Sequence, residues 1–401
     1  MESELRQRAP RGAHGGRLVS GDSTPLRRLA GEGQSAWCDQ LSRQMLRSGR
    51  LADLVERQGI TGLTSNPTIF QRALEGGDWY DEAMARAAAR GMDAPAVYEE
   101  LAVQDIQAVA DLLAPVHRAT RGRDGHVSLE VSPTLAHDPE GTIAEARRLW
   151  AAVDRPNLMI KVPGTAAGLP AVAALLAEGV NVNVTLIFGL ERYRAVLAAH
   201  AQGLARALAA GRPLEQLASV ASFFVSRVDT LVDRWLAERA AHAPGPEAAR
   251  LRALRGRAAI ANARAARVIW TQWVGGEPMR GLSARGAQRQ RLLWASTSTK
   301  DPAYRDVRYV EQLVGRETVN TMPLETIEAF ADHGQVLGQT LDAGADDAAA
   351  TLRELAAAGV DLEAAARELE ADGVRAFADS FTSLLQGIAA KAGRAELGAR
   401  R

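Results

Sequence analysis

The stretch from residue 126 to residue 208 contains the apolar runs HVSLEVS (126–132), LMIKVPG (158–164) and VNVNVTLIF (180–188). The segment AEARRLWAAV (144–153) lies between the first two runs, and LERYRAVLAAHAQGLARAL (190–208) follows the third. Apolar residues recur at helical spacing in both segments. The stretch therefore predicts strands that alternate with helices, which is the pattern of a parallel sheet.

Five further runs extend this pattern over most of the chain. They are SAWCDQL (35–41), GITGLTSN (59–66), SVASFFVSRV (219–228), RLLWAST (291–297) and ETVNTMP (317–323). Eight strand–helix units in one chain predict an α/β fold in which the sheet closes into a (β/α)8 TIM barrel. A doubly wound open sheet is the structural alternative.

The chain of 401 residues is long enough for this barrel and an addition to it. Residues 1–25 are rich in Arg, Gly, Pro and Ser without apolar periodicity, so we expect a flexible leader. Residues 26–401 are expected to form one domain. Helical patterns from about residue 345, including 360–390, predict additional C-terminal helices packed on the outside of the barrel.

Two Pro/Gly-rich segments, AHAPGPEAA (241–249) and VGGEPMRGLSARGAQ (274–288), flank the helical pattern at 257–273. Their composition is typical of loops. We expect them to lengthen one strand–helix unit.

The bulk composition excludes several classes of protein. The 48 basic residues equal the 48 acidic ones, so no net charge favours nucleic acid or an anionic membrane. No apolar run reaches the length of about 18 residues that a membrane helix requires, and the amino terminus lacks the apolar core of a secretory signal. The single cysteine, Cys38, cannot form an internal disulfide. These features predict a cytoplasmic protein.

Lysine is rare in this chain. Only Lys161, Lys300 and Lys391 occur, so 45 of the 48 basic residues are arginine. Arginine stays protonated and forms no imine, whereas a desolvated lysine amine is nucleophilic. Lys161 and Lys300 are therefore the first candidates for a chemical role.

Polar residues interrupt the apolar runs near their carboxyl ends, where barrel enzymes carry their reacting groups. They are Asp39, Asn66, Glu130, Lys161, Asn183, Thr185, Ser222, Arg227 and Ser296. Because the strands of a barrel end at one face, we expect these side chains to surround one site.

Lys161 follows three apolar residues in its run, so its amine is expected in a poorly hydrated barrel mouth. It would then act as a nucleophile that forms an imine with a carbonyl. Cleavage of a carbon–carbon bond beside the imine requires a base, and the carbinolamine steps require a second carboxyl. Asp39 suits the first task, and Glu130 suits the second, with a water held by Thr185. Alternatively, either carboxylate is only a charge partner of Lys161.

Several segments together resemble the transaldolases, in particular a bacterial subgroup with a longer carboxyl-terminal part. The resemblance runs in order from about residue 26 to the end. Its segments are GQSAWCDQLSR (33–43), GITGLTSNPTIF (59–70), LEVSPTLAHD (129–138), NLMIKVPGTAAGLPAV (157–172), EGVNVNVTLIFGLERY (178–193), ASVASFFVSRVDTLVD (218–233), GRAAIANAR (256–264) and LLWASTSTKDPAY (292–304).

The resemblance implies a barrel of the class I aldolase type and a role for each matching residue. Lys161 matches the imine-forming lysine, Asp39 the base, and Glu130 with Thr185 the pair that holds a catalytic water. Residues that match substrate-binding positions are Asn66, Asn183 and Ser222 for hydroxyl groups, Arg227 for the phosphate, and Phe224 beside the substrate.

The chain departs from the family pattern after Ser296. Many relatives have an arginine two residues later as a second phosphate ligand, whereas this chain has Ser298. Lys300 lies two residues further on and is the candidate replacement.

The resemblance implies a transferase of the pentose phosphate pathway. It would move a dihydroxyacetone unit from sedoheptulose 7-phosphate or fructose 6-phosphate to glyceraldehyde 3-phosphate or erythrose 4-phosphate through a lysine Schiff base. We expect no cofactor and no metal, because the seven histidines form no metal-ligand pattern. The expected partners are small-molecule sugar phosphates, and the protein would be a monomer or homodimer. Alternatives are a fructose 6-phosphate aldolase that releases free dihydroxyacetone and a sugar-phosphate-binding protein without catalysis.

Overall fold

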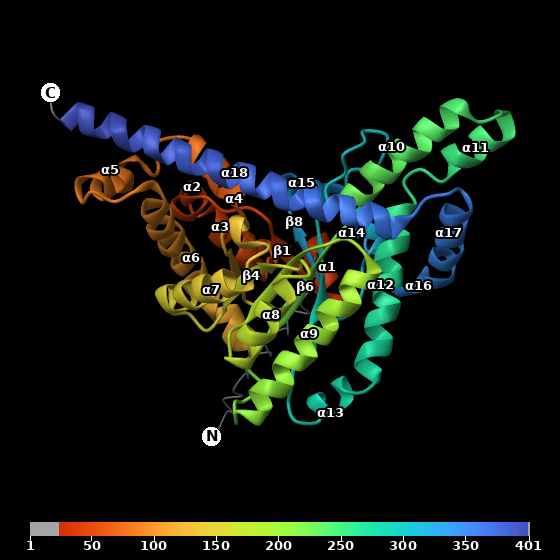
Figure 1. The fold of residues 1–401 in the computed structure, drawn as a ribbon, viewed down its shortest axis with the longest axis horizontal. Coiled ribbons are helices and arrows are strands. Elements are labelled where there is room, and N and C mark those ends of the chain that lie inside the picture. Colours follow the sequence, from red (N-terminus) through yellow and green to blue (C-terminus); the bar gives the residue numbers. More distant parts are fainter. Residues whose placement is uncertain (1–23, 400–401) are drawn as a thin grey trace, which may run out of the picture.

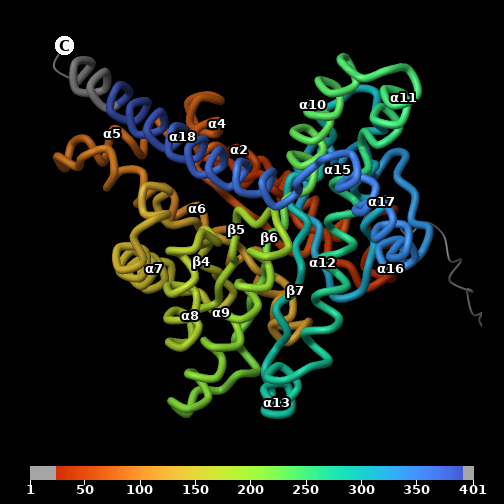
Figure 2. Tube along the Cα trace, turned by 45° about the vertical axis from the view of Figure 1, so that its right-hand side comes forward, coloured from red at the N-terminus to blue at the C-terminus, as the bar shows by residue number. Residues whose placement is uncertain are grey.

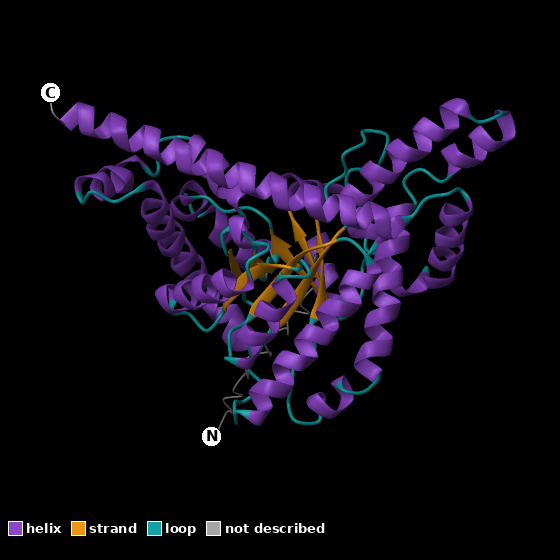
Figure 3. Cartoon of the chain, viewed as in Figure 1, coloured by secondary structure: helices purple, strands orange, loops and turns teal. Residues whose placement is uncertain are grey.

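The structure is a computed structural model that describes residues 24–399, and the side chains only up to residue 391. Eight parallel strands form a closed barrel in which each strand pairs with its neighbours in sequence and β1 pairs with β8. The strands are β1 (Gln34–Cys38), β2 (Gly62–Leu63), β3 (Val127–Glu130), β4 (Leu158–Pro163), β5 (Val182–Ile187), β6 (Ser219–Phe224), β7 (Arg291–Ala295) and β8 (Thr318–Met322). The predicted (β/α)8 barrel is confirmed, and the helices surround it (Figures 1 and 3).

The helices are α1 (Pro25–Gly31), α2 (Arg43–Arg47), α3 (Arg50–Asp53), α4 (Pro67–Glu75), α5 (Asp81–Ala89), α6 (Ala94–Ala119), α7 (Pro139–Val153), α8 (Gly168–Ala177), α9 (Leu190–Ala209), α10 (Ser226–His242), α11 (Gly245–Ala253), α12 (Ala258–Gly275), α13 (Met279–Ser283), α14 (Arg308–Gln312), α15 (Leu324–His333), α16 (Thr340–Ala343), α17 (Ala345–Ala357) and α18 (Leu362–Ala399). A π-helical turn (Leu54–Gln58) and a 3-10 turn (Pro133–Leu135) complete the elements. No helix within residues 24–399 has both the length and the apolar composition that crossing a bilayer requires.

Short sequence signals explain where several helices begin. Asn66, Asp93 and Asp138 each precede a helix and accept a hydrogen bond from a backbone N–H in its first turn. A proline occupies the first or second position of each of these helices. A side-chain acceptor followed by proline satisfies the free N–H groups and fixes the first backbone angle, so the helix starts at this point.

The structure differs from the sequence prediction at a few boundaries. Strand β2 has only two residues, and the end of the run at 219–228 forms the first turn of α10. The segments 241–249 and 274–288 are not wholly loops, because α11 begins within the first and α13 lies within the second. In α11 a proline and an acidic residue occupy the first turn, and both favour a helix start.

The predicted leader lies almost entirely outside the described residues, which begin at Thr24, the N-cap of α1. Two of the predicted C-terminal helices are α17 and α18. Whether residues 26–401 fold as a single unit stays a prediction.

Helix α18 crosses the end of the barrel toward which the strand arrows point (Figures 1 and 3). Figure 2 shows the same helix across this end from another side. Glu363 accepts hydrogen bonds from Leu190 N and Glu191 N at the start of α9, at 3.0 and 3.1 Å. Further along, Ser380 bonds Thr68 at 2.9 Å, and Lys391 forms an ion pair with Asp81 at 3.0 Å. The helix is therefore held on both sides of the barrel mouth.

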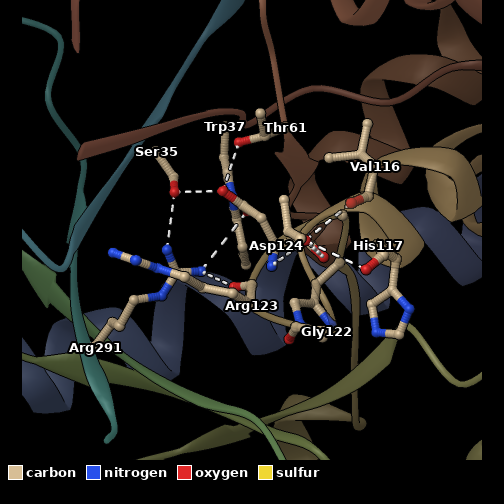
Figure 4. A network of polar contacts seen from close by, with 12 residues as sticks. Ser35, Trp37, Thr61, Val116, His117, Gly122, Arg123, Asp124 and Arg291 are labelled. Carbon is tan, nitrogen blue, oxygen red and sulfur yellow. Dashed lines mark hydrogen bonds and ion pairs between the residues drawn. The ribbon is translucent and has the colours of Figure 1, made fainter. Parts of the chain in front are cut away.

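A buried polar network joins strands at the opposite end of the barrel (Figure 4). Asp124 accepts hydrogen bonds from Trp37 Nε1 at 2.7 Å, from Thr61 Oγ1 at 2.9 Å and from Ser35 Oγ. Arg291 donates to Ser35 Oγ at 2.8 Å, and its Nη2 lies 3.7 Å from Asp124 Oδ1. One carboxylate thus links β1, β7 and the segments that lead into β2 and β3.

Gly62 lets the Trp37 indole lie against the backbone of β2. A Cβ at position 62 would come within 2.4 Å of the Trp37 ring, which only glycine avoids. The close approach of the indole to β2 therefore requires glycine at position 62.

We predict that Asp124→Ala lowers the free energy of unfolding by about 3 to 5 kcal/mol, because it leaves the buried Arg291 without its counter-charge and the Trp37 N–H without its acceptor. Urea unfolding measures the change. Asp111→Ala is the matched control, because Asp111 pairs with Arg155 at the surface and exposed pairs contribute little. Equal losses in the two variants would contradict the prediction.

Candidate active site

A cavity of about 380 Å³ opens at the carboxyl ends of the strands, under α18. Nine of the residues predicted from the sequence line it: Asp39, Asn66, Lys161, Thr185, Ser222, Phe224, Arg227, Ser296 and Lys300. The remaining two, Glu130 and Asn183, lie directly behind lining residues. The structure thus brings together side chains from seven strands and the segments that follow them.

The register between neighbouring strands sets the positions of Glu130 and Lys161 relative to each other. Glu130 of β3 is the pairing partner of Lys161 on β4, and Asn183 of β5 pairs with Lys161 on the other side. Lys161 Nζ lies 3.0 Å from Glu130 Oε2 and donates to Ser65 O at 3.1 Å. The two residues are only 4% and 5% exposed, so the ion pair is shielded from solvent.

Asp39 follows β1 and faces the same cavity. Its Oδ1 accepts a hydrogen bond from Thr64 Oγ1 at 2.6 Å. Burial raises the pKa of Asp39, while the charge of Lys161, the Thr64 hydrogen bond and the charge of Arg227 oppose the rise. Asp39 is therefore a carboxylate whose basicity is increased and which stands beside the amine, as a general base requires.

Two polar groups near the amine have no hydrogen-bond partner among the described residues. They are the buried Glu130 Oε1 and Thr185 Oγ1. Burial raises the pKa of Glu130, the charge of Lys161 lowers it, and that of Asp39 raises it. Both unpartnered atoms suit contact with water or substrate, because a buried polar atom is costly unless it is bonded.

The predicted hydroxyl-binding residues differ in how many of their side-chain hydrogen bonds are already made within the protein. Asn183 is fully buried, donates to Ser128 Oγ at 3.0 Å and accepts from Ser222 Oγ at 2.7 Å. It therefore lies behind Ser222 and orients that hydroxyl at the cavity wall. Asn66 uses its Oδ1 to cap α4, and its Nδ2 donates to no other described residue.

Three cationic side chains line the outer part of the cavity. Arg227 stands in the first turn of α10, Lys300 follows β7, and Arg72 belongs to α4. Burial lowers the pKa of Lys300, Glu325 raises it, and the charges of Arg227 and Arg72 lower it. Burial also lowers the pKa of Arg227. Like charges this close favour a bound anion.

Ser298 is buried in the wall beside these cations. Its hydroxyl accepts a hydrogen bond from Lys300 Nζ at 2.8 Å. This bond holds the ammonium of Lys300 at the cavity. The geometry is compatible with the predicted substitution of Lys300 for the missing arginine, which stays a prediction.

The backbone of Ser296 has a positive φ of 56°, which is uncommon for a residue other than glycine. Its hydroxyl lies 2.9 Å from Ser226 Oγ, at the start of α10. This contact joins the segment after β7 to the start of α10, so the segments that carry Lys300 and Arg227 are fixed relative to each other.

Two aromatic rings give the cavity its apolar wall. Phe224 packs on Phe188 with 4.9 Å between the ring centroids, and the Arg227 guanidinium lies 5.4 Å from the Phe224 centroid. Phe377 of α18 faces the cavity with its ring centroid 5.8 Å from Lys161 Nζ. These rings limit the access of water to the amine.

Sequence reasoning missed Arg72, Phe377, Thr64 and Ser65. Arg72 stands in PTIFQRA, directly after the run that contains Asn66, so its nearness to a strand end was an available signal. Phe377 had no such signal. Its helix is far away in sequence, and helical periodicity does not tell which surface the helix covers.

The arrangement can perform imine chemistry on a phosphorylated carbonyl compound. A buried amine, a base of raised pKa, a second carboxyl and an anion-binding rim meet in one cavity. These are the groups that covalent catalysis through an imine requires.

Comparison with known proteins agrees with this chemistry. Residues 36–388 match the family described as Transaldolase/Fructose-6-phosphate aldolase. The protein named Transaldolase of Parafrankia sp. is 51% identical over 319 residues, which are 80% of this chain and 85% of the relative. Transaldolase of Thermobifida fusca is 52% identical over 79% and 84%, and Transaldolase 1 of Streptomyces avermitilis is 50% identical over 80% and 84%. The match over most of both chains confirms the resemblance seen in the sequence, and the chain belongs to the transaldolase/fructose-6-phosphate aldolase family.

Proposed function

We propose that the protein is a transaldolase in which Lys161 carries a three-carbon ketose fragment from one sugar phosphate to another. The observation that carries the proposal is the buried ion pair between Lys161 and Glu130 in a cavity that Asp39 also lines. The names of the relatives support it, since proteins about half identical over most of their length are transaldolases by name.

The reaction begins when Lys161 transfers a proton to Glu130 and attacks the ketone of fructose 6-phosphate or sedoheptulose 7-phosphate. The carbinolamine then loses water as Glu130 returns the proton, and a protonated imine forms. Thr185 and Glu130 hold the water that leaves at this step. No net proton is gained or lost, because the lysine starts as an ammonium ion.

Asp39 then removes the proton of the hydroxyl on the far carbon of the bond that breaks. The electrons of the carbon–carbon bond move into the imine, an aldose phosphate leaves, and an enamine of dihydroxyacetone stays on Lys161. Phe224 and Phe377 keep water from this intermediate. A second aldose phosphate accepts the fragment by the reverse steps.

The phosphate groups of both substrates are expected to bind the rim formed by Arg227, Lys300 and Arg72. Arginine binds phosphate oxygens through its planar fork of N–H groups, and lysine adds a point charge. Asn66 and Ser222 bind hydroxyl groups of the three-carbon unit, and Asn183 holds Ser222 in position.

We predict that borohydride reduction in the presence of fructose 6-phosphate attaches a three-carbon group or the whole sugar to Lys161 alone. Peptide mass spectrometry locates the modification, and Lys300 and Lys391 are internal controls in the same sample. Lys161→Arg should fold and lose activity by roughly 10⁴-fold or more, because arginine forms no imine. An unmodified Lys161, or an active Lys161→Arg protein, would refute the proposal.

Product analysis with and without erythrose 4-phosphate separates a transaldolase from an aldolase. We expect sedoheptulose 7-phosphate to form when the acceptor is present, and little free dihydroxyacetone without it. Release of dihydroxyacetone at full rate without acceptor would assign the alternative activity.

We predict that Arg227→Ala raises KM for fructose 6-phosphate by about 10- to 100-fold, since it removes a charge-assisted hydrogen bond to phosphate. Arg72→Ala and Lys300→Ala should raise KM less, because both side chains are more exposed than that of Arg227. The turnover of unphosphorylated fructose should hardly change. Arg194→Ala, on the exposed face of α9, is the control, and an equal loss for phosphorylated and unphosphorylated sugar would contradict the assignment.

The pH dependence of the activity should follow the ionisation of the Asp39 carboxyl group. As a base it acts only when ionised, so activity is complete above its raised pKa and falls as the pH drops through that value. Thr64→Val removes a hydrogen bond that stabilises the carboxylate, so the acid limb of kcat/KM should move to higher pH. Thr297→Val is the control, since its equally buried hydroxyl donates to Asn320 and not to a carboxylate. A limb that stays in place or moves to lower pH in Thr64→Val would contradict this role of Asp39.

We further propose a cytoplasmic location and a monomeric or homodimeric state. The absence of a paired cysteine supports the former, because Cys38 is the only cysteine and is fully buried.

A further inference from the structure

Two buried threonine hydroxyls lie in line with the Asp39 carboxylate. Thr64 Oγ1 donates to Asp39 Oδ1 at 2.6 Å, and Thr321 Oγ1 lies 2.7 Å from Thr64 Oγ1. Thr64 and Thr321 are 1% and 2% exposed, and both line the substrate cavity. Thr321 and Thr64 therefore form a chain of hydrogen bonds, here called the hydroxyl chain, that ends on the proposed base.

The barrel brings these residues together from three neighbouring strands. Thr321 belongs to β8, Asp39 follows β1, and Thr64 follows β2. Strand β1 pairs with β8 on one side and with β2 on the other. Asp39 N donates to Met322 O at 2.7 Å, and Thr64 N donates to Cys38 O at 2.9 Å. The backbone therefore holds the three side chains at fixed positions relative to one another.

The number of hydrogens fixes the direction of each bond in the hydroxyl chain. A threonine hydroxyl has one hydrogen and two acceptor lone pairs, and an ionised carboxylate only accepts. The hydrogen of Thr64 is therefore committed to Asp39. Thr321 must then donate to Thr64, because the Thr64 oxygen has only lone pairs left for that contact. Both hydroxyl groups thus point their hydrogens toward the negative charge.

The bond that Thr64 accepts strengthens the bond that it donates. Hydrogen bonds in a chain polarise one another, by roughly 10–30% for each bond. Thr321 has no contact with Asp39 of its own among the printed hydrogen bonds of the described residues, so it acts on the carboxylate through Thr64. The hydroxyl chain therefore stabilises the ionised form of Asp39 more than Thr64 would alone.

Charged and titratable groups of other strands also act on this carboxyl. Burial raises the pKa of Asp39, and the charges of Lys161 and Arg227 lower it. The charge of Asp39 in turn raises the pKa of Glu130 and of the Cys38 thiol. Because Thr321 is uncharged, removing its hydroxyl leaves all of these charges in place.

The hydroxyl chain also makes the two carboxylate oxygens of Asp39 different. Oδ1 accepts from Thr64, and no described residue donates to Oδ2. Both oxygens of Glu130 are closed off from solvent, whereas Oδ2 of Asp39 is not among the fully buried atoms that lack a partner. Oδ2 is therefore the oxygen that is open to the cavity.

We propose that Thr321, acting through Thr64, is a positioning residue for Asp39, and that the hydroxyl chain holds Oδ1 so that Oδ2 takes the proton of the substrate hydroxyl. This inference rests on the proposed function, because it assigns the base to Asp39. Oδ2 keeps the proton while the aldose phosphate leaves and returns it to the aldehyde oxygen of the acceptor as the new carbon–carbon bond forms. The proton count is therefore balanced over one transfer.

The pH profile of kcat/KM for fructose 6-phosphate tests this role. Thr321→Val keeps the shape of the side chain and removes the hydroxyl that donates to Thr64. The ionised form of Asp39 then loses stabilisation, so its pKa rises further. The acid limb should move to higher pH by about 0.2 to 0.6 of a unit, because the chain adds roughly 10–30% to a hydrogen bond with a charged group.

A double-variant cycle separates an effect through Thr64 from a direct effect of Thr321. Thr64→Val should move the acid limb by itself, and Thr64→Val with Thr321→Val should move it no further. Thr321→Ser retains the hydroxyl and should keep the wild-type limb. Thr318→Val is the matched control, because Thr318 is an equally buried threonine of β8 whose hydroxyl donates to Gly315 O and to no carboxylate.

An acid limb that stays in place in Thr321→Val would overturn the inference, and so would a loss of activity that is equal at every pH. A shift in the double variant equal to the sum of the two single shifts would do the same. If the double variant does not fold, the comparison of Thr321→Val with Thr321→Ser decides. Failure of the proposed function looks different: Thr64→Val itself would leave the limb in place, and borohydride would not trap Lys161.

Discussion

The site depends on the ion pair between Lys161 and Glu130 inside the barrel. Removing two charges from water costs more free energy than their attraction regains unless the geometry is good, so a buried pair is weak evidence for stability. In the proposed function, the pair serves proton transfer and not stability. A carboxylate 3.0 Å from the amine can take its proton and return it, and neighbouring strands in fixed register hold that distance.

The register also explains the order of the remaining groups. Lys161 has Glu130 on one side and Asn183 on the other, because parallel neighbours β3 and β5 pair directly with β4. Beyond the pair, β5 is irregular between Val184 and Ile187. Leu186 there has a positive φ, and α18 passes so close that a Cβ on Gly373 would lie 2.9 Å from the Leu186 side chain. The irregular strand end is thus where the covering helix contacts the barrel.

The two ends of the barrel have different physical tasks. At the amino end, Asp124 accepts hydrogen bonds from Trp37 and Thr61 and stands near Arg291, so these four side chains are satisfied by one another. At the carboxyl end, Glu130 Oε1 and Thr185 Oγ1 are unpartnered within the described part of the chain. A saturated network stabilises a fold, whereas unpartnered groups are available to react, which agrees with the usual division of a TIM barrel.

The sequence by itself determined the barrel, the family and the central lysine. Alternation of apolar runs and helical segments depends only on local residue order, and the scarcity of lysine directed attention to Lys161. The prediction of loops in the Pro/Gly-rich segments was wrong where helices such as α11 begin, because composition alone favoured loops. The tertiary structure decided that Arg72 joins the cationic rim, that Asn183 stands behind Ser222, and that Phe377 covers the amine. These relations join residues far apart in the chain, and they follow from strand register and helix docking, which periodicity does not encode.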